Sequence, residues 1–297
     1  MIIIFFLINI CFSLIHQFDE DNAFALLEKQ CEFGPRYPGS IGHEEFSEYL
    51  INYFSKLNCT IEIFTDSIYH PNQKDLKIQI KNILVHHNPE INNRLLFMAH
   101  WDTRDRAEKD EDINNRSKPI IGANDGASGV ALLMELSDYI SNYPLKNIGI
   151  DFLFVDAEDM GRKNHTYEWG LGTQSFTKSY DGIMPKYAIC IDMIADKNPI
   201  FKIERFSYQF AKELVQEIWT FANNLGYKEF VWQLGPAIYD DHFFFYEGTK
   251  VPSINIIDFD YEHWHTTQDI PENCSSKGLG IVGNVMLNFI YEIDKNE

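Results

Sequence analysis

Five continuous apolar segments constrain the fold of this chain more than any other feature of its sequence. They read KNILVHH, RLLFMAH, GIDFLFVD, KYAICIDMI and PSINIID and occupy residues 81–87, 94–100, 149–156, 186–194 and 252–258. Strands without polar alternation are buried on both faces, as in a mostly parallel sheet that helices cover. The segment TIEIFTD, residues 60–66, does alternate and predicts a half-buried strand.

Segments with helical apolar spacing lie before, between and after the predicted strands. They cover residues 19–32, 42–57, 127–141, 172–180, 207–224 and 275–292. Alternation of strands and helices predicts an α/β fold, here a three-layer sandwich with a central mixed, mostly parallel sheet and helices on both faces. The sequence contains no internal repeat or low-complexity linker, so we expect residues 17–297 to form a single catalytic domain.

The chain begins with an apolar leader, MIIIFFLINICFSLIHQ. Its apolar run is too short to span a bilayer comfortably and suits the core of a signal peptide. We therefore expect residues 1–16 to be a signal peptide or a short anchor, and the protein to enter the secretory pathway and be secreted or lumenal. Four triplets match the glycosylation acceptor pattern and agree with that compartment. They begin at Asn58, Asn115, Asn164 and Asn273.

Net charge and cysteine usage narrow the partners and the redox chemistry. The formal net charge of -19 argues against a nucleic-acid backbone or an anionic membrane as partner, so we expect no stable membrane association beyond an N-terminal anchor. Four cysteines follow the leader, and no CxxC pair among them indicates a zinc ribbon or a thioredoxin-type motif. They are Cys31, Cys59, Cys190 and Cys274. A disulfide between two of them stays open, but the strand position of Cys190 favours a buried free thiol.

Ionisable side chains follow several of the predicted strands. In strand order they are His100 and Asp102, Glu158 and Asp159, Asp192, and His265 in the loop after the last strand. Ligands of open α/β sheets bind beyond the carboxyl ends of the strands, so we expect these side chains to lie close together. Each motif alone is weak evidence for a functional site, because a histidine at a strand end usually has a structural role.

A glycine-rich turn supplies another carboxylate, Asp125, in GANDGASGVALLMEL just before a predicted helix. The simpler interpretation is that Asp125 or Ser128 caps the helix. The glycines on both sides of Asp125 would, however, let the backbone bring the carboxylate close to a bound ion. Asp125 is therefore a candidate metal ligand.

Adjacent acids and a late histidine complete the pattern. In extended backbone the side chains of Glu158 and Asp159 diverge, so one can ligate a metal while the other faces the reacting atoms. A surface position explains His263, whereas His265 adds a nitrogen where the carboxylates converge. Nitrogen and carboxylate ligands suit zinc, with one position open for substrate in a catalytic site. The motifs GxSxG and GxxxxGK[ST] are absent from the sequence, and no GxGxxG follows a first strand.

Several motifs resemble, in their order, those of the zinc-dependent glutaminyl-peptide cyclotransferases of animals and bacteria. They are PRYPGS, AHWD, GANDGASGVALLMEL, DAED, LGTQSF, IDMI, DDHFFF, VPSINII and WHTTQD. The resemblance extends from about residue 20 to residue 290. These enzymes share the fold of zinc aminopeptidases, which the resemblance therefore implies for this chain.

The resemblance also implies roles for individual residues. A single zinc ion per chain would be held by Asp125, Asp159 and His265. The general base and acid would be Glu158, in an acidic network completed by Asp192 and Asp240. The pocket for the substrate side chain would be lined by Trp169 and Trp264. Two further residues, His100 and Asp102, would hold a second metal or support the ligands from behind. Position 159 departs from the animal enzymes, which carry Glu there.

The implied reaction converts N-terminal Gln of peptides and proteins, and more slowly Glu, to pyroglutamate, with release of ammonia in the case of Gln. A two-zinc aminopeptidase is the alternative, because its ligand set is also complete: His100, Asp125, Asp159, Asp192 and His265. Asp240 to His242 and Trp264 favour the cyclotransferase. A third interpretation is a binding ectodomain without catalytic activity. Such a protein would be expected to lack some of the zinc ligands, whereas the motifs here retain all of them, which disfavours this interpretation.

Overall fold

The computed structural model describes residues 16–297 of the chain, so the predicted leader lies outside the described residues except for His16. Six strands form one sheet in the order β1-β2-β4-β3-β5-β8. Their bounds are β1 Thr60–Tyr69, β2 Lys77–His87, β3 Arg94–His100, β4 Gly149–Val155, β5 Tyr187–Asp192 and β8 Ser253–Ile257. Strands β4, β3, β5 and β8 are mutually parallel, whereas β2 is antiparallel to both β1 and β4. The predicted mixed, mostly parallel sheet is confirmed.

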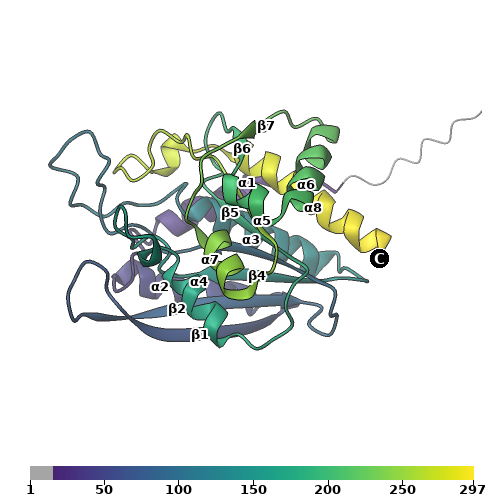
Figure 1. Cartoon of the computed structure of the whole chain (residues 1–297), viewed down its shortest axis with the longest axis horizontal. Helices are drawn as coiled ribbons and strands as arrows, with labels where there is room; N and C mark the ends of the chain where they lie inside the picture. Colours follow the sequence, from purple (N-terminus) through teal and green to yellow (C-terminus); the bar gives the residue numbers. More distant parts are fainter. Residues whose placement is uncertain (1–15) are drawn as a thin grey trace, which may run out of the picture.

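Helices cover both faces of this sheet (Figure 1). On one face α3 (Ala127–Asn142) packs on the central strands, α2 (Ile41–Phe54) contacts β2, and α1 (Glu20–Cys31) and α8 (Ser276–Asn296) pack on α3. On the other face lie α4 (Leu171–Ser179), α5 (Arg205–Phe210) and α7 (Asp241–Thr249), while α6 (Lys212–Asn224) packs beside α8. The three-layer sandwich expected from the sequence is therefore confirmed.

Strand β4 shows why the apolar segments lack polar alternation. Phe152 and Phe154 belong to the larger core beneath α3, whereas Leu153 and Val155 belong to the smaller core beneath α4 and α7. All four side chains are fully buried. A strand that packs on both faces has no solvent-facing positions, so its residues are apolar except for Asp151, whose buried carboxylate binds His86 and Arg94.

The structure corrects the predicted helix at 207–224, which is two helices. Helix α5 ends at Phe210, and Ala211 has φ -146° and ψ 49°, which interrupts the helical hydrogen bonding before α6 begins at Lys212. The buried carboxylate of Glu204 caps α5 by accepting the backbone N–H groups of Phe206 and Ser207. A helix start fixed by this cap sets the direction of α5 independently of α6.

Several short elements were not predicted. A separate parallel pair is formed by β6 (Phe201–Ile203) and β7 (Phe230–Leu234), and 3-10 helices cover Thr166–Glu168 and Pro271–Asn273. Segments this short carry too little periodicity to be recognised in a sequence. Over residues 16–297, no helix combines the length and apolar character needed to cross a bilayer. All four cysteines in this range are free thiols, and Cys190 is buried as expected.

Glu135 on α3 provides a test of the packing between α1 and α3. Its side chain accepts a hydrogen bond from Asn22 of α1, and burial raises the pKa of Glu135 from 4.5 to about 7. Because the folded pKa lies above the unfolded value, ionisation costs stability above about pH 7, and this cost disappears as the pH falls towards 4.5. We expect Glu135→Gln to raise Tm at pH 8.5 by about 2–4 °C.

The gain should shrink at pH 5.5, as measured by calorimetry at the two pH values. Glu292→Gln, which removes an exposed carboxylate of α8, serves as the matched control and should change Tm equally at both. An equal gain from Glu135→Gln at both pH values would show that ionisation of Glu135 is not the cause.

Candidate functional site

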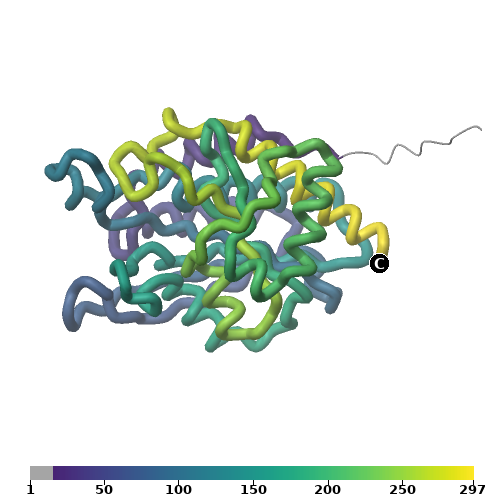
Figure 2. Tube along the Cα trace, turned by 45° about the horizontal axis from the view of Figure 1, so that its top comes forward, coloured from purple at the N-terminus to yellow at the C-terminus, as the bar shows by residue number. Residues whose placement is uncertain are grey.

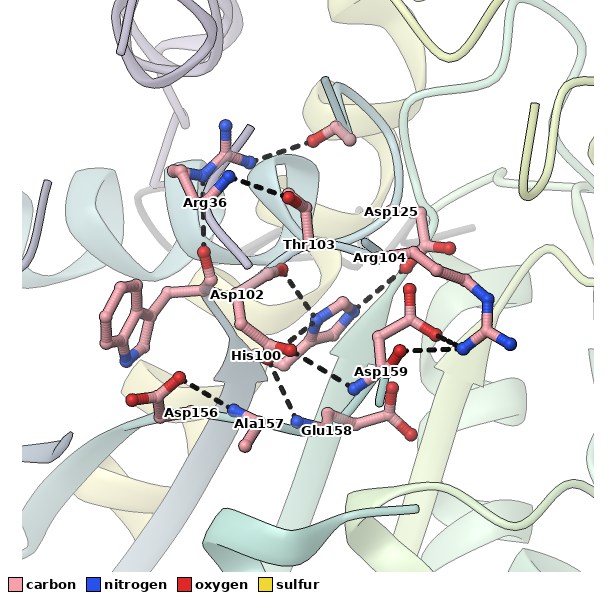
Figure 3. Close-up of polar contacts among 12 residues, drawn as sticks. Arg36, His100, Asp102, Thr103, Arg104, Asp125, Asp156, Ala157, Glu158 and Asp159 are labelled. Atoms are coloured by element: carbon pink, nitrogen blue, oxygen red, sulfur yellow. Dashed lines mark hydrogen bonds and ion pairs between the residues drawn. The ribbon is translucent and has the colours of Figure 1, made fainter. Parts of the chain in front are cut away.

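The carboxyl ends of β3, β4, β5 and β8 meet at one edge of the sheet, and most of the predicted site residues gather there. Among them, Figure 3 shows His100, Asp102, Asp125, Glu158 and Asp159. Most of the predicted site residues line one pocket of about 40 Å³. The predicted residues in its lining are Asp125, Glu158, Asp159, Trp169, Asp192, Asp240, Trp264 and His265. His100 and Asp102 are buried behind this lining.

Asp125, Asp159 and His265 form the first group that could hold a metal ion. His265 Nε2 lies 3.2 Å from Asp159 Oδ1 and 3.5 Å from Asp125 Oδ2. Within residues 16–297, Oδ2 of Asp125 and Oδ2 of Asp159 are buried without a hydrogen-bond partner. Buried carboxylate oxygens without a partner are costly, and a cation bound between them removes the cost. The residues present therefore fit a metal ion, and one nitrogen with two carboxylates suits zinc.

His100, Asp125 and Asp192 form a second group, which shares Asp125 with the first. His100 Nε2 lies 3.1 Å from Asp125 Oδ1 and 3.2 Å from Asp192 Oδ1, and Nδ1 donates to the backbone oxygen of Asp102 at 3.2 Å. Burial lowers the pKa of His100, but hydrogen bonds to Asp102, Asp125 and Asp192 outweigh it and hold this pKa well above 6.5. These contacts place the His100 ring between the carboxylates of Asp125 and Asp192.

Glu158 faces the same pocket, close to both groups. Its side chain is almost fully buried, and this burial, followed by the charge of Asp240, raises its pKa well above 4.5. Asp102 fixes the backbone here, because its carboxylate accepts the N–H of Glu158 at 3.0 Å and of Asp159 at 3.2 Å. With both oxygens taken up in this way (Figure 3), Asp102 supports the turn and does not face the pocket.

Asp240 lies at the start of α7 beside Glu158. It accepts hydrogen bonds from the side chain of Asn255 and from the backbone N–H of Asp241. Asp241 is completely buried and accepts the hydroxyl of Thr173 at 2.6 Å, and burial, followed by the charge of Asp240, raises its pKa well above 3.8. Sequence reasoning identified Asp240 and Asp241 but not Asn255 and Thr173, which bind their carboxylates.

Arg104 and Glu108 were also missed, although they contact residues of the first group. Glu108 Oε1 accepts a hydrogen bond from His265 Nδ1 at 3.0 Å. Arg104 binds the same carboxylate through Nε at 2.8 Å and Nη2 at 2.6 Å, and its Nη1 lies 3.1 Å from Asp159 Oδ1. Figure 2 shows their loop beside the one that carries His265, and the N–H of Lys109 donates to the oxygen of His265. A contact of this kind produces no periodic pattern in the sequence. Its single indication was the spacing of four residues between the charged Arg104 and Glu108 in a polar loop.

Two tryptophans lie near the His265 ring. The Trp169 ring lies nearly parallel to the His265 ring, with centroids 6.2 Å apart and 9° between planes, and the Trp264 centroid is 4.2 Å away. Arg104 lies over Trp169, with 4.8 Å from its guanidinium carbon to the ring centroid. The same loop thus supports Trp169 as well as His265.

Three non-glycine residues at this site have a left-handed backbone conformation. Ala157, next to Glu158, has a φ of 53°, and Met193, next to Asp192, has a φ of 46°. His265, a member of the first group, has a φ of 57°. Such conformations cost about 1–3 kcal/mol each and persist where the surrounding structure imposes them. They turn the chain sharply at the ends of β4 and β5 and in the His265 loop.

Comparison with known proteins gives one family match. A model described as peptidase family M28 matches residues 82–290. Among solved structures, a glutaminyl cyclase from Bacteroides thetaiotaomicron is 31% identical with a TM-score of 0.87, covering 93% of this chain and 99% of that one. A Tannerella forsythia glutaminyl cyclase is 33% identical with a TM-score of 0.87 over the same shares.

Peptidases match about as well. A leucine aminopeptidase precursor from Bacteroides thetaiotaomicron is 31% identical with a TM-score of 0.88, and the match covers 93% of this chain and 98% of that one. The resemblance to glutaminyl cyclases expected from the sequence is confirmed, as is the shared fold with zinc exopeptidases. The comparisons indicate an enzyme.

Proposed function

The chain belongs to peptidase family M28, and within that family we propose that it is a glutaminyl-peptide cyclotransferase. Its substrates would be peptides and proteins with N-terminal Gln, and more slowly Glu, which it would convert to pyroglutamate. The similarity to solved glutaminyl cyclases over 93% of the chain supports this. The observation that carries the proposal is Glu158, poised beside Asp240 in a narrow pocket next to Asp125, Asp159 and His265.

The pocket is small enough to discriminate among side chains. Its free volume is about 40 Å³, and a single water needs ~10–15 Å³ on the same measure. About three or four atoms of a slim side chain fit, which suits the end of a glutamine side chain. Trp169 and Trp264, which both line the pocket near His265, would pack against its flat carboxamide.

One zinc ion would be held by Asp125, Asp159 and His265. When bound, zinc supplies a Lewis acid to the carboxamide oxygen of the substrate. The α-amine of the first residue attacks its own γ-carboxamide carbon, a C–N bond closes a five-membered ring, and the bond to the departing nitrogen breaks. Because both reacting groups belong to one residue, holding the correct conformer supplies much of the acceleration.

Glu158 would move the proton that this reaction requires. Its carboxylate takes a proton from the attacking amine and returns it to the leaving nitrogen, which departs as ammonia. A pKa raised by burial and by Asp240 keeps the proton affinity of Glu158 high enough for both transfers. Asp192 and Asp240 would maintain this network from the ends of β5 and α7.

A two-zinc aminopeptidase is the second candidate, and the complete second group of His100, Asp125 and Asp192 favours it. In that reaction Glu158 would activate a water. Purified protein incubated with a Gln-initiated peptide and with a Leu-initiated peptide separates the two. Loss of ammonia, about 17 Da, from the first peptide without release of an amino acid is the cyclase result. Release of leucine, together with two tightly bound zinc ions per chain, would establish the peptidase instead.

The contact between Glu108 and His265 gives a quantitative prediction. Glu108→Gln removes the charge that favours the Nδ1 proton of His265, so we expect zinc affinity to fall by about 10–100-fold. Competition with a chelator measures the affinity directly. Arg104→Lys, which keeps a cation near Glu108 and Asp159, should lose less affinity than Arg104→Met. Unchanged affinity in Glu108→Gln would show that this contact does not tune the site.

We further propose that the protein enters the secretory pathway, as its leader sequence suggests. Asn58 and Asn164 are the acceptor positions best suited to glycosylation, because both are exposed. Asn115 and Asn273 are less exposed, and their side chains already donate hydrogen bonds, to Asp110 and to the oxygen of Gln268. Peptide mapping of protein secreted from a eukaryotic host tests this order.

A further inference from the structure

The turn that carries Asp125 is held by the loop that carries His265. Asp269 lies four residues after His265, and its side chain is fully buried. Its Oδ1 accepts the backbone N–H of Asn124 at 2.8 Å, and its Oδ2 accepts the N–H of Asp125 at 3.1 Å. The backbone oxygen of Asp269 also accepts the N–H of Ala123 at 3.3 Å. One residue thus binds three consecutive N–H groups of the turn.

Asp269 is itself fixed by the loop around His265. The hydroxyl of the buried Tyr261 donates to Asp269 Oδ1 at 3.0 Å. The N–H of Asp269 donates to the oxygen of Thr266 at 3.2 Å, and the N–H of Thr266 donates to the oxygen of His263 at 3.1 Å. Two successive turns therefore join Asp269 to His265, so its carboxylate links the two metal-binding segments directly.

The two carboxylate oxygens of Asp269 differ in what they bind. Oδ1 accepts two donors, the N–H of Asn124 and the hydroxyl of Tyr261, whereas Oδ2 accepts the N–H of Asp125. An asparagine at this position would keep its one oxygen where the two donors converge and would turn its NH2 group towards the N–H of Asp125. Two donors would then face each other in a buried place, and the N–H of Asp125 would lose its acceptor.

We propose that Asp269 is a positioning residue for the metal ion, because it holds Asp125 at a fixed place relative to His265 before the ion binds. The proposal rests on the proposed function only for these zinc ligands, which the cyclase and the aminopeptidase would share. Asp269 is buried behind the pocket lining, so it acts through Asp125 and does not touch a substrate. Ligands that are already in place spare the ion the free-energy cost of ordering them.

Asp269→Asn should lower zinc affinity by about 10–100-fold, measured by competition with a chelator. The turn keeps its attachment to the loop after β5, where Asn124 Oδ1 accepts the N–H of Ala195 at 2.7 Å, so we expect the variant to fold. Circular dichroism checks the fold. The absorption bands of cobalt bound in place of zinc should shift, because they report the arrangement of the ligands. A loss of overall stability alone would leave these bands unchanged in the folded protein.

Asp258→Asn is the matched control. Asp258 is a buried acid at the start of the same loop, and its carboxylate accepts the N–H of Ile200 at 3.1 Å and of Asp260 at 3.2 Å. The variant therefore removes the same kind of bond from the same loop without touching the turn of Asp125. It should keep both zinc affinity and the cobalt bands. Equal losses in Asp258→Asn and Asp269→Asn would overturn the proposal, because weakening of the loop would then explain both.

Tyr261→Phe provides a milder second variant. It removes the hydroxyl that fixes Asp269 and keeps the ring, so zinc affinity should fall by about two- to fivefold, in line with loss of one hydrogen bond next to the positioning carboxylate. If Asp269→Asn does not fold, this variant decides the question. Weaker zinc binding by folded Tyr261→Phe supports the proposal, and unchanged binding overturns it.

These measurements separate the proposal from the choice of reaction. Zinc affinity and cobalt spectra are recorded without substrate, whereas turnover of Gln-initiated and Leu-initiated peptides by the wild-type protein distinguishes cyclase from aminopeptidase. Weaker zinc binding by Asp269→Asn than by Asp258→Asn supports the positioning role even if the wild-type protein releases leucine. Unchanged zinc affinity in Asp269→Asn, or a wild-type protein that binds no zinc, overturns it, whichever reaction the protein catalyses.

Discussion

Replacement of Glu158 by Gln is expected to lower kcat for Gln-initiated peptides by about 10²–10⁴-fold, the usual range for loss of a general base and acid. The amide keeps the size of the side chain in its buried position, but it can neither take the proton of the attacking amine nor deliver it to the leaving nitrogen. Because Glu158 stands outside the three residues proposed to bind zinc, the variant should keep its metal. Steady-state kinetics and zinc content per chain are measured on the same preparation.

Glu213→Gln, an exposed change on α6, is the matched control and should retain full activity and zinc. Loss of zinc from Glu158→Gln would show that Glu158 is a ligand. Activity near that of the wild-type protein, with zinc retained, would place the base elsewhere, and Asp240 and Asp192 would then be the acidic candidates in the pocket outside the proposed zinc ligands.

Replacement of Asp125 by Asn is expected to have an equally large effect through the metal. Asp125 belongs to both groups that could hold an ion, with Oδ2 3.5 Å from His265 and Oδ1 3.1 Å from His100. A neutral amide weakens zinc binding and leaves His100 with one carboxylate fewer. We expect zinc to be lost on dialysis and turnover to fall by at least about 10³-fold, the scale set by loss of electrostatic stabilisation at a reacting centre.

Circular dichroism should show that Asp125→Asn remains folded, and Asp181→Asn, an exposed change after α4, should keep its zinc. Removal of zinc from the wild-type protein with a chelator should reproduce the loss of turnover, and added zinc should restore it. Full zinc content and turnover in Asp125→Asn would contradict the proposed ligand set.

Strand positions and the meeting of the site residues could be predicted from sequence for one physical reason. Apolar segments identified β3, β4, β5 and β8, and parallel strands bring their carboxyl ends to one edge, so residues such as His100 and Asp192 were expected to lie together. That argument requires only the positions and directions of the strands, and the local sequence is sufficient to predict both.

Contacts made by loops could not be predicted in the same way. The bond from Glu108 to His265 joins residues 157 positions apart in two irregular loops, and no repeating pattern specifies their meeting. The split between α5 and α6 at Ala211 was missed because alanine favours helices, while the interruption depends on the capping of α5 by Glu204 and on packing against β8.

The left-handed residues at the site have a consequence for how this protein could be engineered. Glycine adopts positive φ without the steric cost that Ala157 incurs, so Ala157→Gly should make the fold more stable, despite the greater entropy glycine gives the unfolded chain. At Met193 the same relief is outweighed, because glycine there would also remove a buried side chain that packs with Ile257 and Tyr261. A stability screen of all substitutions would then mark Ala157 as an exception among buried residues. Such a screen could locate the catalytic pocket without any substrate, because a strained backbone conformation that lowers stability is found where the site requires a particular geometry.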